Sequence, residues 1–374
     1  MQPIWNPPQS RIDNSRIAQF QEYLETKYGQ SFSSYEELHS WSVEKREDFW
    51  QAIWDFCGMV ASEPPTAILT QPDDMLKARW FEGARLNFAE NLLRYRDDRI
   101  ALISLSESIG REDESGERTE ISYAQLYQRV AQLQHSMKSS GIGVGDCVAA
   151  YLPNMAETVI AMLATTSLGA IWSSCSPDFG VNGVLDRLGQ IKPKLLFTAD
   201  QYFYNGKTID LWDRIEEISA GLPELKQIIV VTAENQELPA ACPDRCIRYG
   251  EFISSEERLD LSFSQQAFDH PAFILYSSGT TGKPKCIIHG AGGTLIQHLK
   301  EHQLHTNLGR DDNFFYFTTC GWMMWNWAIS GLASGATVVL YDGSPFYPKP
   351  DRLFDLIETE KISVFGTSAK FISA

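Results

Sequence analysis

The feature that most constrains the fold is an alternation of short apolar runs with amphipathic segments, which begins near Ile100. Runs such as 147–152, 195–198 and 226–232 have the length of strands, whereas the segments between them carry apolar residues at helical spacing. Buried strands separated by helices form parallel sheets that are covered on both faces. The sequence therefore predicts an α/β fold of layered parallel sheets flanked by helices.

The remaining elements follow from the same periodicities. Ser122 and Gln125 have the spacing of a capping box and predict the start of an amphipathic helix. A charged turn at 111–117 predicts a hairpin between the strands on either side of it. Further strands are predicted at 100–108, 118–123, 170–174, 272–276, 286–289, 314–319, 336–341 and 362–366, and helices at 155–168, around 184–188, at 326–334 and at 352–360.

Residues 1–95 show a different pattern from the rest of the chain. They are rich in aromatic residues, and their apolar residues recur at helical spacing. A helix capped by Asn14 or Ser15 is predicted to end near Gly29, and Ser34 predicts the start of another. We interpret this part as a helical layer packed onto a larger domain.

Charge and composition exclude several classes of protein. A net charge of −16 argues against nucleic acid or an anionic membrane as the main partner. No apolar run reaches the roughly 18 residues that a membrane span needs, and no signal peptide is visible. Seven scattered cysteines are typical of the reducing cytoplasm, and Cys242 and Cys246 lack the second pair of ligands that a zinc site needs.

The segment YSSGTTGKPK, 276–285, is the strongest functional signal in the chain. Such a composition often marks a turn or a flexible linker, but here two strand-like runs hold both ends. Gly279 and Gly282 permit positive φ and a close approach of the backbone. Together with the hydroxyl groups, Lys283 and Lys285 make a concavity for an anion, and phosphate is the natural candidate.

Two features of the chain bear on whether this segment binds phosphate, namely the spacing of its glycines and the negative net charge. The P-loop of nucleotide hydrolases has four residues between its glycines and enters a helix, whereas here two residues intervene and Pro284 follows Lys283. The negative net charge is screened over about 8 Å at physiological salt. Charge-assisted hydrogen bonds, at about 1.5–3 kcal/mol each, outweigh that screened field.

The same ten residues resemble the phosphate-binding signature of the adenylate-forming enzymes, which include acyl-CoA synthetases, luciferases and peptide-synthetase adenylation domains. The resemblance extends over essentially the whole chain. Segments 34–50 and 78–93 look like the N-terminal extension of the acetyl-CoA synthetase branch, and 122–172 looks like the start of the adenylation fold. Within that branch, 176–200 and 318–345 most resemble the acetoacetyl-CoA synthetases.

The resemblance implies two domains, a helical N-terminal extension at 1–95 and an AMP-binding (adenylation) large domain at 96–374. It implies ATP-dependent activation of acetoacetate to acetoacetyl-CoA through an acyl-adenylate, with ATP, Mg²⁺ and coenzyme A. Two alternatives stay open: a synthetase for another short acid such as acetate or propionate, and a non-catalytic nucleotide-binding remnant.

The resemblance also implies roles for individual residues. Asn326 or a tryptophan indole N–H would meet the 3-keto oxygen of the acid, and Lys207 would contact a phosphate of coenzyme A. The expected acyl pocket consists of Trp322, Met323, Met324, Trp325 and Asn326. The expected ATP phosphate site consists of Ser277, Ser278, Gly279, Thr280, Thr281, Gly282, Lys283 and Lys285.

Several family features are missing from this sequence. The aromatic-Gly-x-Thr-Glu motif that helps to hold magnesium is absent, because the similar stretch at 365–368 lacks the acid. The ribose-binding Asp, the hinge and the small C-terminal domain with its catalytic lysine are absent as well. The expectation is therefore an N-terminal fragment with a truncated large domain, no complete catalytic set and no synthetase activity of its own.

The histidines after the loop are weaker candidates. His298 and His302 are four residues apart, which suits either a shared metal or, more simply, an exposed helix face. His289 directly follows a predicted strand and is a possible site residue.

Overall fold

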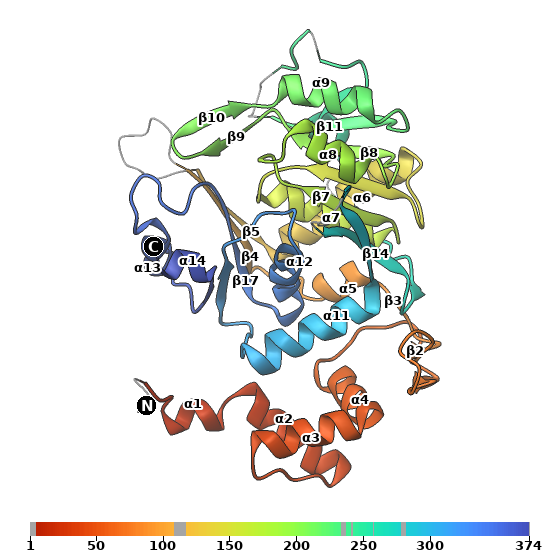
Figure 1. The fold of residues 1–374 in the computed structure, drawn as a ribbon, viewed down its shortest axis with the longest axis vertical. Coiled ribbons are helices and arrows are strands. Elements are labelled where there is room, and N and C mark those ends of the chain that lie inside the picture. The colour runs from red at the N-terminus through yellow and green to blue at the C-terminus, as the bar shows by residue number, and fades with distance from the viewer. Residues whose placement is uncertain are drawn as a thin grey trace.

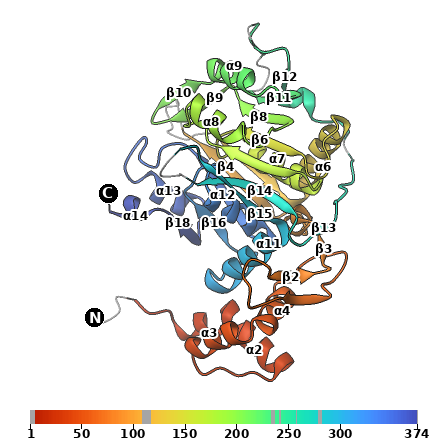
Figure 2. The ribbon, with the colours of Figure 1, turned by 45° about the vertical axis from the view of Figure 1, so that its right-hand side comes forward.

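The computed structural model describes residues 5–107, 117–232, 237–240, 242–256, 258–277 and 282–373. Two large sheets lie one above the other, with helices between and around them, and a layer of N-terminal helices packs at one end (Figures 1 and 2). This arrangement confirms the predicted α/β class of layered parallel sheets flanked by helices.

The larger sheet has seven strands in the order β12-β11-β8-β6-β7-β14-β15. Every neighbouring pair is parallel except β14 and β15, which form an antiparallel hairpin at one edge. The carboxyl ends of six strands therefore lie at the same edge of the sheet, where folds of this class bind ligands. The strands are β6 (Cys147–Tyr151), β7 (Ile171–Cys175), β8 (Leu195–Ala199), β11 (Gln227–Val231), β12 (Cys246–Arg248), β14 (Pro271–Ser277) and β15 (Lys285–Gly290).

The smaller sheet has five strands in the order β18-β16-β17-β4-β5, and only β5 runs antiparallel to its neighbour. The hairpin of β4 and β5 confirms the predicted strand pair, although most of the charged turn between them lies outside the described residues. The strands are β4 (Ile100–Ser106), β5 (Arg118–Ser122), β16 (Asn313–Tyr316), β17 (Thr337–Asp342) and β18 (Val364–Gly366).

Helices cover both sheets, as the alternation of the sequence predicts. The helix predicted at 326–334 starts earlier and finishes as a 3₁₀ turn. The helices are α6 (Tyr123–Ser139), α7 (Ala156–Ser167), α8 (Val181–Leu188), α9 (Trp212–Gly221), α10 (Tyr249–Phe252), α11 (Ala291–Lys300), the π-helical η1 (Glu301–His305), α12 (Met323–Ile329), the 3₁₀-helical η2 (Ser330–Ser334), α13 (Arg352–Thr359) and α14 (Ala369–Ile372).

The N-terminal part begins with helices and continues with short strands that the sequence analysis did not predict. β1 and β2 pair as an antiparallel hairpin, and β3 pairs with the distant β13. Strands of two to four residues are too short to show the two-residue period of a strand, so the sequence pattern does not predict these strands. The elements are α1 (Gln9–Asp13), α2 (Arg16–Tyr28), α3 (Tyr35–Glu44), α4 (Arg46–Phe56), β1 (Ala67–Thr70), β2 (Arg79–Glu82), β3 (Arg85–Leu86), α5 (Phe88–Leu92) and β13 (Gln266–Ala267).

The predicted helix caps are mostly confirmed. Ser15 caps α2, which ends at the left-handed Gly29, and Ser122 with Gln125 forms a complete capping box at α6. At α3, Ser34 caps as expected, but the Glu37 carboxylate accepts the N–H of Ser33 and not that of Ser34.

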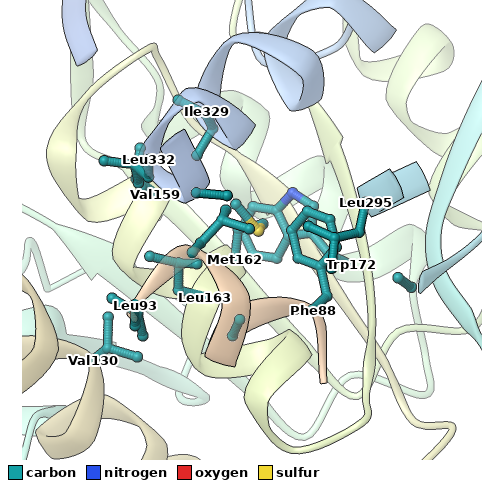
Figure 3. Packing of buried hydrophobic residues seen from close by; sticks show 14 of the residues in the cluster. Phe88, Leu93, Val130, Val159, Met162, Leu163, Trp172, Leu295, Ile329 and Leu332 are labelled. Atoms are coloured by element: carbon teal, nitrogen blue, oxygen red, sulfur yellow. The ribbon is translucent and has the colours of Figure 1, made fainter. Parts of the chain in front are cut away.

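Helix α7 lies at the centre of the molecule between the two sheets. All of its residues except Glu157 are buried, and it contacts β7 of one sheet and β4 of the other. Figure 3 shows Val159, Met162 and Leu163 of this helix in the middle of a cluster that also includes Trp172. A helix that is buried on all sides must form the hydrogen bonds of its polar groups within the protein. In α7 the threonine hydroxyls donate to carbonyls of the preceding turn or, at the N-terminal end, to the Pro153 carbonyl.

The expectation of an exposed helix face at His298 and His302 is wrong. The two side chains are 6% and 0% exposed, because α11 packs against α4 and η2, and η1 packs against α2 and η2. The His298 ring bonds the Ser330 hydroxyl at 2.8 Å, and His302 Nε2 bonds the Trp327 carbonyl at 2.7 Å. Burial lowers the pKa of His298 to about 3 and that of His302 to about 4, so both rings are neutral at pH 7.

A buried asparagine ties the end of α7 to two other segments. The Asn87 side-chain amide donates to the carbonyls of Thr166 and Ser167 and to that of Ser264, at 2.9–3.1 Å. Its oxygen caps α5 by accepting the N–H of Glu90. One side chain therefore satisfies the backbone groups of three segments that are distant in the sequence.

We predict that Asn87→Ala lowers the free energy of unfolding by roughly 2–4 kcal/mol, since it removes a helix cap and three further hydrogen bonds to carbonyls in the interior. Urea denaturation measures the change. The control is Asn14→Ala, whose amide bonds only the exposed Ser10 carbonyl and which we expect to matter by less than about 0.5 kcal/mol. Equal losses in the two variants would contradict the assignment.

Candidate active site

The sequence-predicted phosphate loop connects β14 to β15. The two strands pair from Pro271 and Gly290 up to Ser277 and Lys285, so the hairpin holds both ends of the loop in register. Ser277 is the last residue of β14 and Lys285 is the first of β15, and of the residues between them the structure describes 282–284. The predictions for Ser278, Gly279, Thr280 and Thr281 fall outside the described residues.

The C-terminal end of the loop contacts helix α8 and the turn that follows this helix. The Lys283 ammonium lies 3.6 Å from the Asp186 carboxylate, and the Gln190 amide donates to the Pro284 carbonyl at 2.8 Å. Gly282 has a φ of +117°, a conformation that residues with a side chain rarely adopt. Lys285 is exposed, and within the described part of the chain no carboxylate lies within ion-pair distance of it. Of the two lysines, Lys285 is thus the one whose charge is available to a ligand.

Helix α8 also connects the loop to the segment that follows β7. The Arg187 guanidinium lies over the Phe179 ring at 4.5 Å and over the Tyr276 ring at 6.0 Å. Tyr276 is the last apolar residue of β14, and burial raises the pKa of its hydroxyl well above the usual value. The Ser173 hydroxyl donates to this phenol oxygen at 3.0 Å.

The segment after β16 reaches the same edge of the larger sheet. The Ser174 hydroxyl donates to the Cys320 carbonyl, and the Cys320 thiol donates to the Leu152 carbonyl. A Cβ at Gly321 would stand 3.1 Å from the Phe179 ring. The phosphate loop, α8, Phe179 and this turn are therefore connected by direct contacts, and the turn delivers α12 to the site.

The five residues predicted for the acyl pocket differ in their surroundings. Trp322 and Met323 are 62% and 43% exposed, and Met324 packs against the small cluster around Trp327. Trp325 is fully buried, and its indole N–H already donates to Asn154 at 2.9 Å. That indole can meet a ligand only by giving up Asn154.

Asn326 is different, because its side chain is buried without partners. It is 3% exposed, and neither its amide nitrogen nor its carbonyl oxygen has a hydrogen-bond partner in the described part of the chain. An unsatisfied buried polar group costs about 1–3 kcal/mol. Such a group requires an explanation, and a polar ligand at this position is one.

Lys207, the predicted contact for coenzyme A, follows the turn of a hairpin formed by β9 (Gln201–Tyr204) and β10 (Lys207–Asp210). The residue is exposed, and no ion pair to it occurs within the described ranges. The hairpin continues from β8 and extends over the end of the smaller sheet (Figure 1).

The remaining candidates are not brought to the loop by any described contact. His289 is half-buried on β15 opposite Phe273, and burial lowers its pKa. Cys242 and Cys246 are both free and partly buried. The described ranges contain no group of three His, Cys, Asp or Glu residues placed to share a metal ion. They also contain no helix long and apolar enough to cross a membrane.

The sequence analysis missed the residues that anchor the loop. Asp186 lies in α8 and Gln190 lies two residues after its end, and polar residues are usual on exposed surfaces of this kind. Phe179 stands in a loop without periodicity. Only the three-dimensional contacts assign these three residues to the site.

Comparison with known proteins identifies the family of the chain. The family model described as AMP-binding enzyme matches residues 88–373, and the one described as acetyl-coenzyme A synthetase N-terminus matches residues 35–92. The chain is 47% identical to the acetoacetyl-coenzyme A synthetase of Rhizobium meliloti over 100% of its length and 56% of the relative. It is 42% identical to the malonamoyl-CoA synthetase vrtB of Penicillium aethiopicum, with 95% and 51% covered.

A solved structure, the acetoacetyl-CoA synthetase from Streptomyces lividans, superposes with a TM-score of 0.92 at 39% identity, over 100% of this chain and 56% of the other. The chain thus spans about half the length of the relatives that it matches. The AMP-binding match alone covers most of the chain, so the chain belongs to the family of AMP-binding enzymes.

Proposed function

We propose that this chain forms the ATP- and acid-binding part of an acid–thiol ligase that converts acetoacetate to acetoacetyl-CoA through an acyl-adenylate. The observation that carries the proposal is the match of the entire chain to acetoacetyl-CoA synthetases in sequence and in fold. The substrates are MgATP, acetoacetate and coenzyme A.

The loop between β14 and β15 supplies the phosphate-binding groups. At the C-terminal end of the loop, Lys283 contacts Asp186 of α8 and the Pro284 carbonyl accepts a hydrogen bond from Gln190. The Lys285 ammonium is therefore the one that binds the β- and γ-phosphates. These groups are hydrogen-bond donors and cations, so they fit phosphate oxygens and not the metal, and Mg²⁺ enters as part of the MgATP substrate. Positioning and charge stabilisation are the protein's main contributions to such a reaction.

Asn326 gives the acid site its specificity. Acetoacetate has a carbonyl oxygen on C3, which the amide nitrogen of Asn326 is able to bond. Malonamate, the acid that corresponds to malonamoyl-CoA, has the same shape, with an NH₂ group in place of the methyl. The side-chain oxygen of Asn326 would accept from that NH₂ group, so the same residue suits either acid, and malonamate is the second candidate substrate. Met323 and Met324, at the start of α12, limit the length of the acid.

An acid panel tests the function. The enzyme that contains this chain is given MgATP, coenzyme A and either acetoacetate, malonamate, butyrate, propionate or acetate, and thioester and AMP are followed. We expect turnover to be highest with an acid that carries a C3 carbonyl. Highest turnover with acetate or propionate would support the short-acid alternative. Nucleotide binding without any turnover would support the non-catalytic one.

Lys285→Ala should lower kcat/KM for MgATP by about tenfold or more, the value of one charge-assisted hydrogen bond. The KM for the acid should change little, because the ammonium meets phosphate and not the acyl group. Steady-state kinetics with each substrate varied in turn measures both, and Lys138→Ala on the exposed side of α6 is the control. A change confined to the KM of the acid would refute the phosphate role.

Asn326→Leu should lower kcat/KM for acetoacetate by roughly 10–100-fold, because the C3 oxygen loses its hydrogen-bond donor in a desolvated site. Butyrate, which lacks that oxygen, is the internal control and should be used as well as before or better. A parallel loss with both acids would mean that Asn326 supports the fold and not the specificity.

A further inference from the structure

A buried carboxylate holds the turn that precedes Lys207. Glu107, directly after β4, is 4% exposed. Its carboxylate accepts the backbone N–H of Asn205 at 2.8 Å and that of Gly206 at 2.9 Å, and it also accepts the N–H of Ser344. Across the described ranges, no cationic side chain forms an ion pair with it. A carboxylate bound in this way is satisfied by backbone dipoles alone.

The turn itself has little freedom. Asn205 and Gly206 have φ values of 53° and 74°, as in the tight two-residue turns that match the twist of a hairpin. A Cβ at Gly206 would stand 2.6 Å from the Tyr347 ring, so the tip lies directly against the segment after β17.

A second acidic side chain lies beside the same hairpin, closer to the base of the hairpin. Burial raises the pKa of Asp342, at the end of β17, to about 7, and the nearby backbone of Phe203 partly opposes that rise. Both carboxylates belong to the smaller sheet, whereas the hairpin continues from β8 of the larger one (Figures 1 and 2). The hairpin therefore bridges the two sheets, and its orientation depends on these contacts.

The arrangement also keeps two opposite charges apart. Lys207 is the next residue after Gly206, yet the Glu107 carboxylate is engaged by the N–H groups of the turn and forms no ion pair with the ammonium. The lysine is thus fixed at its backbone and remains exposed for an anion. A long surface lysine without such a fixed base contributes little to binding.

We propose that Glu107 is a positioning residue that holds the turn at 205–206 so that Lys207 meets the 3′-phosphate of coenzyme A. The inference rests on the proposed function, because it takes coenzyme A as the substrate that Lys207 contacts. Glu107 itself touches no substrate and acts through the backbone of the hairpin.

Binding of coenzyme A and of 3′-dephospho-coenzyme A tests the proposal, in the parent protein, in Glu107→Gln, in Lys207→Ala and in the double variant. Glutamine has the shape of glutamate but only one acceptor oxygen and no charge. We expect Glu107→Gln and Lys207→Ala each to weaken binding of coenzyme A by about fivefold, the value of an exposed charge contact. Binding of the dephospho form and of MgATP should stay unchanged, and the double variant should be no weaker than Lys207→Ala.

Hydrogen–deuterium exchange on residues 201–210 reports on the turn without any ligand. The Asn205 and Gly206 amides should exchange faster in Glu107→Gln but not in Lys207→Ala. Gly206→Ala leaves Glu107 intact but must push the tip of the hairpin away from Tyr347. This variant should also weaken binding of coenzyme A and leave binding of the dephospho form and of MgATP unchanged. Glu120→Gln, on the neighbouring β5, is the matched control and should resemble the parent protein.

Three results would overturn the inference: unchanged exchange at 205–206 in Glu107→Gln, an equal loss for all ligands, or a further loss on top of Lys207→Ala. Equal affinity of the parent protein for the two forms of coenzyme A would show that the 3′-phosphate makes no contact with Lys207, and it would thereby refute the positioning role of Glu107 as well. The adenylation proposal would survive that result, because it is tested separately with MgATP and the acids.

Discussion

The burial of helix α7 is the constraint on which the rest of the structure depends. A helix enclosed between two sheets cannot hydrogen-bond water, so its hydroxyl side chains donate to carbonyls of the chain itself, and Asn87 donates to its last carbonyls. Its apolar side chains fill the space between the sheets, and this packing keeps β4 of one sheet at a fixed position relative to β7 of the other (Figure 3). Side chains in such interiors are close-packed, so the relative position of the sheets is determined to within small shifts.

That fixed position is what allows segments from both sheets to form one site. The phosphate loop and Phe179 follow strands of the larger sheet, whereas the Cys320 turn and α12 follow β16 of the smaller one. Hydrogen bonds from Ser174 and Cys320 cross directly between the two sets of loops. A displacement of one sheet relative to the other would break these hydrogen bonds and separate the groups proposed to bind phosphate from those proposed to bind the acid.

The sequence predicted the elements with a clear period and did not predict the contacts that join them. The strands at 147–152 and 195–198 and the capping box at Ser122 are local patterns, and the structure confirms them. The hairpin at 201–210 was missed, although Asn205-Gly206 between β-prone residues is a known hairpin signal. The buried state of His302 has no local signal at all, because it results from α2 and α12, which are distant in the sequence. The same holds for Glu107, whose partners Asn205 and Ser344 lie about 100 residues or more away.

The pairing of charges explains how a chain with a net charge of −16 keeps the lysines that we propose to bind phosphate accessible. Lys283 is a lysine with a carboxylate beside it, because its ammonium lies 3.6 Å from Asp186. Burying a carboxylate without a partner costs several kcal/mol, so each buried acid requires donors from some source. At Glu107 these donors are three backbone N–H groups, which carry no net charge and are fixed by the turn and by β17. The acid is thereby stabilised without the use of a lysine, and Lys207 and Lys285 remain available to anions although acidic residues outnumber basic ones.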